Sequence, residues 1–249
     1  MRKTSVFIII ASAIFWVFNL AHSSELNSIY INKSLNINQY FSSKNYAYNL
    51  SYQAKGKWDK GKGFTVRIDN NEQLFIDSCP TLIKSFESGY QTSNLAQKNS
   101  YRTIYTQCKA INLIVSDSEN ARKSYLKRFH LNLNNIKNLP EVTALVISNE
   151  QSKSLDKHEE SQYSDFVKIK SISFPKKGEA RIFDINGAVQ DISIIAKADF
   201  NKDKIEDVLL LTANYKPDGY YSASTLFLLT KLADKAIWNV LAIYPESNP

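Results

Sequence analysis

A short stretch of the chain places oxygen-bearing side chains at alternating positions. Asp199, Asn201 and Asp203 stand at its first, third and fifth positions, and Asp207 stands at the ninth. Hard cations such as calcium take six to eight oxygen ligands, and alternate side chains of a tight loop can converge on one ion. The backbone carbonyl of Ile205 can supply a further oxygen. The spacing therefore predicts a calcium loop over residues 199–207, against the simpler alternative of a polar hairpin turn.

The same stretch resembles a known class of calcium loop. Its pattern is similar to the Asp-x-Asp/Asn-x-Asp-Gly-x-x-Asp loop of FG-GAP and VCBS-type repeats, which build integrin α-like propeller blades. The resemblance implies a structural metal held by the four oxygen-bearing side chains and the Ile205 carbonyl. An EF-hand matches less well, because its twelfth position is a bidentate Glu and that position here is Leu210.

Lys204 departs from this family pattern, which has Gly at the corresponding place. Gly is favoured there because the turn often needs a positive φ, which costs a non-Gly residue about 1 kcal/mol or more. A Lys ammonium beside the loop would also repel a bound cation. The resemblance covers a single unit, since a second acidic start at residues 184–187 is followed by Ala188 where an acid is needed. A complete propeller is therefore excluded.

Cys79 and Cys108 are the only cysteines in the chain. In an exported protein such a pair favours one disulfide, whereas in a reducing compartment it would be two buried thiols. A metal site is less consistent with the sequence, because no His and no third Cys accompanies the pair. We expect a Cys79–Cys108 disulfide, which contributes on the order of 3 kcal/mol by the chain-entropy estimate.

Sequence motifs for catalysis are missing from the chain. Beyond the first 23 residues its histidines are His130 and His158, and His158 lacks the second His that a zinc-protease helix carries four residues on. There is no Gly-x-Ser-x-Gly elbow, no P-loop and no Gly-rich dinucleotide fingerprint. The sequence leans away from an enzyme, although a hydrolase that uses dispersed Asp or Glu residues stays open.

Two segments favour recognition of a partner at the surface. In the first, four lysines surround Trp58 in a Gly-rich loop, where an exposed Trp would suit an interface anchor; the alternative is a Trp that folds back onto the sheet. In the second, tyrosines flank a turn near the predicted calcium loop, where they serve either recognition or the core. The candidate partner-binding residues are Lys55, Lys57, Trp58, Lys60, Lys62, Tyr215, Tyr220 and Tyr221.

The first 23 residues are typical of a secretory signal peptide. Arg2 and Lys3 precede an apolar run over residues 6–20, and an Ala-His-Ser triplet ending at Ser23 fits a cleavage site. The alternative is a transmembrane anchor, but a helical anchor needs about 20 apolar residues, and no later segment is apolar enough to span a bilayer. We therefore expect a periplasmic or secreted protein.

The charge balance argues against a nucleic-acid partner. Because the predicted signal peptide contains Arg2, Lys3 and no acid, its removal lowers the formal charge from +7 to +5. This modest excess lacks the clustered basic stripe of nucleic-acid-binding proteins and instead favours acidic partners weakly.

Periodicity predicts strands and helices in the first half of the chain. Alternating apolar residues predict strands at 46–52 and 64–68, paired as a hairpin with the basic loop at its tip, and a short strand at 74–76. Helical spacing predicts a helix at 78–89, capped by Ser78 and stopped by Gly89, and a second at 101–115. A capping box at residues 116–119 predicts a third helix, with Tyr125, Leu126 and Phe129 on its face.

The second half of the chain predicts strands throughout. Residues 149–164 almost lack apolar side chains and are predicted to be a polar linker or exposed loop. The apolar runs beyond them, separated by short turns, predict an antiparallel meander. We expect strands at 166–174, 180–185, 189–196, 208–213, 225–230 and 237–244.

Together these patterns predict an α+β fold. A hairpin and helices tied by the disulfide occupy residues 24–148, and the β-meander with the calcium-type loop occupies residues 165–249. Export, a disulfide and no catalytic motif favour an envelope protein that binds a protein partner, such as a periplasmic inhibitor or an immunity-type protein directed at a toxin or hydrolase. The alternatives are a secreted hydrolase or toxin with a carboxylate-based site, and a structural envelope protein.

Overall fold

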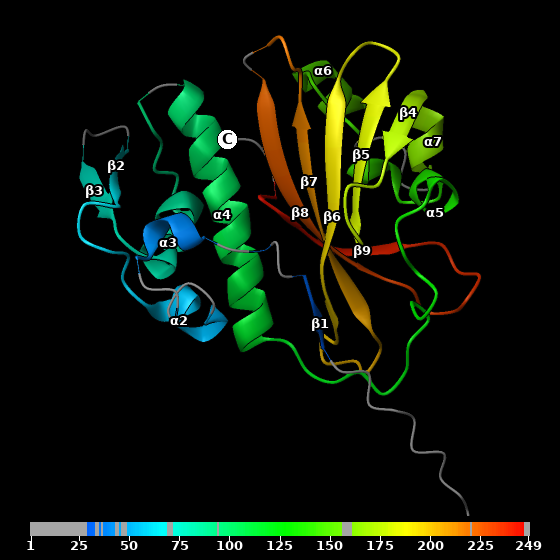
Figure 1. Cartoon of the computed structure of the whole chain (residues 1–249), viewed down its shortest axis with the longest axis horizontal. Helices are drawn as coiled ribbons and strands as arrows, with labels where there is room; N and C mark the ends of the chain where they lie inside the picture. The colour runs from blue at the N-terminus through cyan, green and yellow to red at the C-terminus, as the bar shows by residue number, and fades with distance from the viewer. Residues whose placement is uncertain are drawn as a thin grey trace, which may run out of the picture.

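The computed structural model describes residues 29–32, 35, 37–42, 45, 49–68, 72–93, 95–155, 161–219 and 221–246. The predicted signal peptide lies outside these described residues. The fold is α+β, as predicted, with helices and a hairpin ahead of an antiparallel meander (Figure 1). The helices are α2 (Leu50–Lys55), α3 (Cys79–Glu87), α4 (Leu95–Ser116), α5 (Leu133–Lys137), α6 (Asn149–Leu155) and α7 (Tyr163–Phe166), with 3-10 turns η1 (Asn38–Tyr40) and η2 (Glu141–Thr143).

The sheet follows the chain order of the meander, β4-β5-β6-β7-β8-β9, with every neighbouring pair antiparallel. β1 pairs with the end of β6 that β5 does not cover, with Tyr30 opposite Lys197. A separate hairpin joins β2 and β3. The strands are β1 (Tyr30–Ile31), β2 (Phe64–Arg67), β3 (Gln73–Ile76), β4 (Ile169–Ser173), β5 (Glu179–Asp184), β6 (Val189–Ala198), β7 (Asp207–Tyr215), β8 (Ser222–Thr230) and β9 (Asn239–Tyr244).

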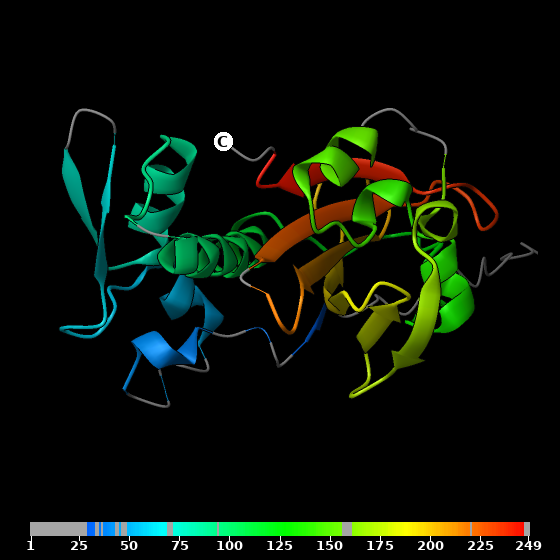
Figure 2. The ribbon, with the colours of Figure 1, turned by 90° about the horizontal axis from the view of Figure 1, so that it is seen from above.

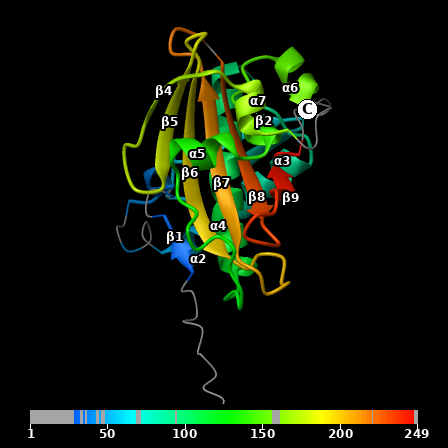
Figure 3. The ribbon, with the colours of Figure 1, turned by 90° about the vertical axis from the view of Figure 1, so that its right-hand side faces the viewer.

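The central strands are covered on both faces. Along β7, Leu209 belongs to the core shared with α3 and α4, whereas Val208 and Leu210 belong to the core shared with residues 126–167. Since successive side chains of a strand point to opposite faces, a continuous apolar run is what a doubly covered strand requires. Figure 2 shows α4 against one face of the sheet, and Figure 3 shows α5, α6 and α7 over the other.

The strand predicted at residues 46–52 is wrong where the structure describes it. Residues 50–55 form α2, and the Asn49 side chain accepts a hydrogen bond from the Tyr52 N–H at the helix N-terminus. Gln53 and Ala54 are buried. The cap and this packing stabilise a helix, and the alternation of apolar and polar residues is too short to specify a strand. β2 consequently pairs with β3, not with the residues before the basic loop.

The helix predicted from the capping box at residues 116–119 is also wrong. α4 continues to Ser116, and the Ser118 hydroxyl donates to the Ile114 carbonyl at 2.6 Å, closing α4 instead of opening a new helix. The residues that follow run beside the β6–β7 loop, with bridges from Glu119 to Asp199 and from Lys123 to Ile205. We call residues 117–131 the wall segment.

The predicted linker contains folded elements. α6 and the start of α7 lie within residues 149–164, and Tyr163 is fully buried, with its hydroxyl donating to Gln190 Oε1 at 2.8 Å. The described part of this segment therefore helps to cover the sheet. The strand predicted at 166–174 begins later, at Ile169, because α7 extends to Phe166. In the described parts of the chain, no helix has the length and apolar character needed to cross a bilayer.

Candidate functional site

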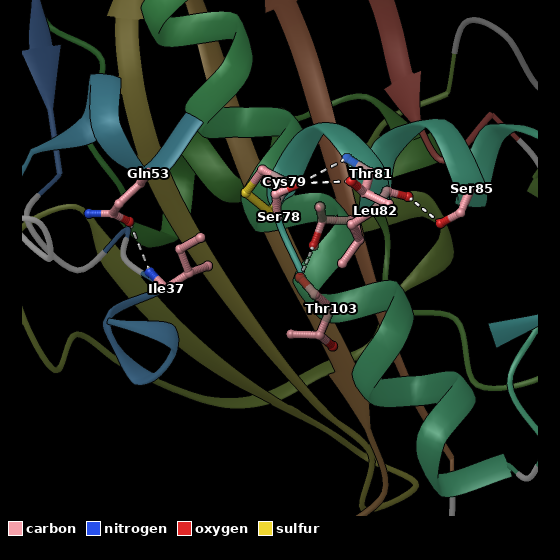
Figure 4. Close-up of a disulfide and its surroundings, with 10 residues drawn as sticks. Ile37, Gln53, Ser78, Cys79, Thr81, Leu82, Ser85 and Thr103 are labelled. Atoms are coloured by element: carbon pink, nitrogen blue, oxygen red, sulfur yellow. Dashed lines mark hydrogen bonds between the residues drawn. A yellow bond between two sulfur atoms is a disulfide. The ribbon is translucent and has the colours of Figure 1, made fainter. Parts of the chain in front are cut away.

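The predicted disulfide is confirmed. Cys79 and Cys108 are bonded and fully buried, and they join the first turn of α3 to the middle of α4 (Figure 4). Ser78 caps α3 by accepting from the Thr81 N–H at 3.3 Å, so the cystine sits at a fixed helix end. The bond holds the two helices together outside the sheet.

The aspartate-rich stretch forms the β6–β7 loop and organises its own backbone. The Asp199 carboxylate is fully buried and accepts from the N–H groups of Lys202 at 2.7 Å and Lys204 at 2.8 Å. Asp203 accepts from the Ile205 N–H at 2.7 Å, and Asn201 accepts from the Asp203 N–H at 3.1 Å. In this tight loop these backbone N–H groups thus donate to side-chain oxygens instead of to the carbonyls of a neighbouring strand.

Lys204 takes the left-handed conformation that the family pattern assigns to Gly, with φ 71°. Its ammonium donates to Glu119 Oε2 at 2.5 Å and lies 4.0 Å from Asp199 Oδ2. The hydrogen bond from Lys204 holds the pKa of Glu119 below its usual range. Lys204 thus places a positive charge between the loop and the wall segment.

Asp207 closes the loop at the start of β7 and is fully buried. Its Oδ2 accepts from the Phe200 N–H at 3.0 Å, whereas Oδ1 has no hydrogen-bond partner. Burial raises its pKa to about 6, and the Phe200 hydrogen bond opposes that rise. Thr230 lies opposite Asp207 on β8, and its hydroxyl lowers the pKa of Asp207. The geometry between the two side chains is not that of a hydrogen bond.

The fit of this loop to a calcium ion is mixed. The orphaned Asp207 oxygen is a potential ligand, and each other carboxylate oxygen keeps a spare lone pair. However, no group of three or more acid, His or Cys side chains arranged to hold a metal occurs among the described residues, and the Lys204 ammonium lies 4.0 Å from the Asp199 carboxylate. Calcium binding by Asp199, Asn201, Asp203, Ile205 and Asp207 stays a prediction.

Trp58 is not an exposed anchor. It is 5% exposed and stacks on Tyr40 with ring centroids 3.9 Å apart, which matches the alternative in which the Trp folds back. The four lysines of this basic loop are exposed, and Lys57 pairs with Asp77 at 2.9 Å. The apolar side chain expected to strengthen a cationic contact is therefore unavailable to a partner.

The predicted tyrosine cluster does not lie near the calcium-type loop. Tyr215 ends β7 and Tyr221 precedes β8, whereas the aspartate loop lies at the opposite end of β7. Both tyrosines are half-buried, and burial raises the pKa of Tyr221. Tyr220 lies outside the described residues.

His130 gives no sign of acting as a catalytic base. Its Nδ1 donates to the Arg128 carbonyl at 2.9 Å, and its Nε2 accepts from the Asn132 amide at 3.0 Å in the tautomer that satisfies both contacts. Both ring nitrogens are thus engaged by non-catalytic groups. His158 lies outside the described residues.

A groove that sequence reasoning missed lies between the wall segment and the β8–β9 loop. Its volume is about 350 Å³, within the range of ligand-binding clefts. Phe129 and Trp238 meet edge-to-face across it, with ring centroids 4.9 Å apart. The remaining lining combines cations, amides and apolar groups: Tyr125, Leu126, Arg128, Asn135, Asn138, Leu139, Pro140, Ser161, Gln162, Lys231, Asp234, Lys235, Ala236 and Ile237.

The groove is cationic, and apolar side chains are exposed on the elements that adjoin it. Of the residues that the structure describes, Arg128, Lys231 and Lys235 line it together with one carboxylate, Asp234. The Lys231 ammonium lies 5.1 Å from the Trp238 ring centroid, and burial lowers its pKa. Among the described residues, four of the nine exposed large apolar side chains gather on the β8–β9 loop and β9, namely Leu232, Ile237, Val240 and Leu241.

β6 and the β6–β7 loop hold the wall segment in place. The Lys197 ammonium donates to the carbonyls of Leu126 at 3.2 Å and Phe129 at 2.7 Å. The Ser124 hydroxyl donates to Glu206 Oε2 at 2.5 Å. The aromatic and cationic side chains of the wall segment are therefore carried by a backbone that β6 and the β6–β7 loop hold in place.

Comparison with known proteins finds no matching family model, curated protein or solved structure. The resemblance of residues 199–207 to FG-GAP and VCBS loops accordingly stays a prediction. The functional argument depends on the groove itself.

Proposed function

We propose that this chain is an exported binding protein of the cell envelope that engages an acidic protein partner, in the manner of a periplasmic inhibitor or an immunity-type protein. The groove between the wall segment and the β8–β9 loop supports this proposal. Interface anchors are enriched in Trp, Tyr and Arg, and Trp238, Tyr125 and Arg128 meet in this one groove.

Charge and shape both favour a protein partner here. Among the described residues, three cations against one carboxylate give the groove a charge that attracts an acidic surface, and the exposed Ile237 side chain adds an apolar contact to its lining. Clustered apolar groups beside a polar groove are typical of interaction surfaces. The basic loop at residues 55–62 is a weaker candidate because Trp58 is buried beneath it.

The groove offers little support for hydrolysis by paired carboxylates. That chemistry needs two Asp or Glu side chains across one site, and among the described residues Asp234 is the one carboxylate that lines this groove. The disulfide agrees with an oxidising compartment. An exported, non-catalytic binding protein is thus the function that these features support best.

The proposal is tested by affinity enrichment from an envelope extract with quantitative mass spectrometry. Arg128→Glu/Lys231→Glu/Lys235→Glu should lose the protein enriched by the wild type, because charge reversal repels an acidic surface. The matched control is Lys55→Ser/Lys57→Ser/Lys60→Ser/Lys62→Ser, which should retain it. Retention by the groove variant together with loss by the control would move the site to the basic loop.

A further inference from the structure

The Lys204 side chain brings a cation close to Asp199, one of the carboxylates that the calcium-loop pattern uses as ligands. Its ammonium lies 2.5 Å from Glu119 Oε2 and 4.0 Å from Asp199 Oδ2. Asp199 is fully buried, and its carboxylate already accepts two backbone N–H groups of the loop. These donors and the nearby positive charge offset the cost of burying that carboxylate.

We propose that the Lys204 ammonium is the resident cation of the β6–β7 loop and takes the place that a metal ion holds in loops of this pattern. A metal ion would bind the loop carboxylates from solution, whereas Lys204 supplies its charge covalently from within the loop. The backbone at Lys204 is left-handed, with φ 71°. This is the conformation that Gly is expected to adopt at the corresponding position of a calcium loop. The calcium-loop pattern has Gly at this position and therefore no side chain, whereas this chain has the Lys204 side chain there.

The internal cation also connects the loop to the wall segment of the groove. Glu119 belongs to the wall segment, and its backbone N–H donates to the Asp199 carbonyl at 2.8 Å. The Lys204 carbonyl accepts from the N–H groups of Arg122 at 2.9 Å and Lys123 at 3.0 Å. Lys204 thus contributes both a charge and a backbone acceptor to the junction that supports one side of the groove.

The first test is a double-mutant cycle on the Lys204–Glu119 pair, read as the shift in melting temperature. Lys204→Met and Glu119→Gln should each lower the melting temperature, and the double variant should lose less than the sum of the two. Lys204→Arg should retain most of the stability because it keeps the charge. Additive losses would show that the pair is not coupled and would overturn the proposal.

The second test measures the melting temperature with millimolar calcium and with a chelator. The wild type should respond to neither, since its cation is internal, which is the opposite of what calcium binding by residues 199–207 requires. Lys204→Gly should gain stabilisation by calcium, because the carboxylates then face an open position and a ligand that binds the native state raises its stability. A wild type stabilised by calcium, or a Lys204→Gly protein that calcium leaves unchanged, would each contradict the proposal.

The matched control for Lys204→Gly is Lys202→Gly. Lys202 also has a positive φ, 67°, but among the described residues the ion pairs of this loop involve Lys204 and not Lys202. Lys202→Gly should relieve the same backbone strain without creating any response to calcium. A calcium response in Lys202→Gly equal to that in Lys204→Gly would assign the effect to backbone strain and reject the ammonium as the cause.

Discussion

Trp58 shows how the surroundings of a single residue decide between a binding role and a core role. Four exposed lysines flank it, yet its ring is buried and stacks on Tyr40 and lies near Phe64. Its indole N–H is buried without a hydrogen-bond partner, so the ring contributes through apolar packing. Composition alone leaves both roles open, because lysines can flank a Trp that points in either direction.

Replacing Trp58 should therefore affect stability more than binding. Trp58→Ala removes a buried ring and should lower the free energy of unfolding by about 3–5 kcal/mol, measured by denaturant unfolding. Trp58→Phe should lower it less, since it keeps an aromatic ring and removes the unpaired N–H. The four Lys→Ser changes should stay within about 1 kcal/mol of the wild type, because exposed charges contribute little. A Trp58→Ala protein with wild-type stability would show that the ring is not part of the core.

Among the secondary-structure elements, the disulfide-linked helices and the meander were predictable, and the segments that join them were not. The stripe of Tyr101, Tyr105 and Cys108 recurs at helical spacing, and α4 buries it as predicted. The strands of the meander carry enough Ile, Val and Leu to be assigned from sequence. By contrast, α2 depends on the Asn49 cap and on packing against α4, which short-range alternation does not report.

The disulfide should stabilise the packing of α3 against α4. Cys79→Ser/Cys108→Ser, or reduction of the wild type, should lower the free energy of unfolding by about 3 kcal/mol, measured by denaturant unfolding with and without reductant. Adding reductant should not change the double variant further, which separates loss of this bond from other effects of the reagent. Two free thiols titrated in the denatured, unreduced wild type would contradict the assignment.

For the whole molecule, the fold brings together residues that are distant in the chain. Phe129 and Trp238 meet in the groove although more than a hundred residues separate them. Sequence reasoning placed Phe129 on a helix and Trp238 in a strand of the meander, so it had no reason to pair them. The composition shows an excess of cations. It does not show that Arg128, Lys231 and Lys235 lie in one groove, because this depends on how the wall segment lies along the sheet.

The most direct measurement of the proposed binding role is site-specific photocrosslinking in an envelope extract. Benzoylphenylalanine at the position of Ile237, which lines the groove and is 66% exposed, should form a covalent adduct with the partner. The same group at the positions of Phe75, 55% exposed on β3, and Lys60 in the basic loop should not. Adducts at Phe75 or Lys60 with none at Ile237 would contradict the assignment of the groove as the binding site.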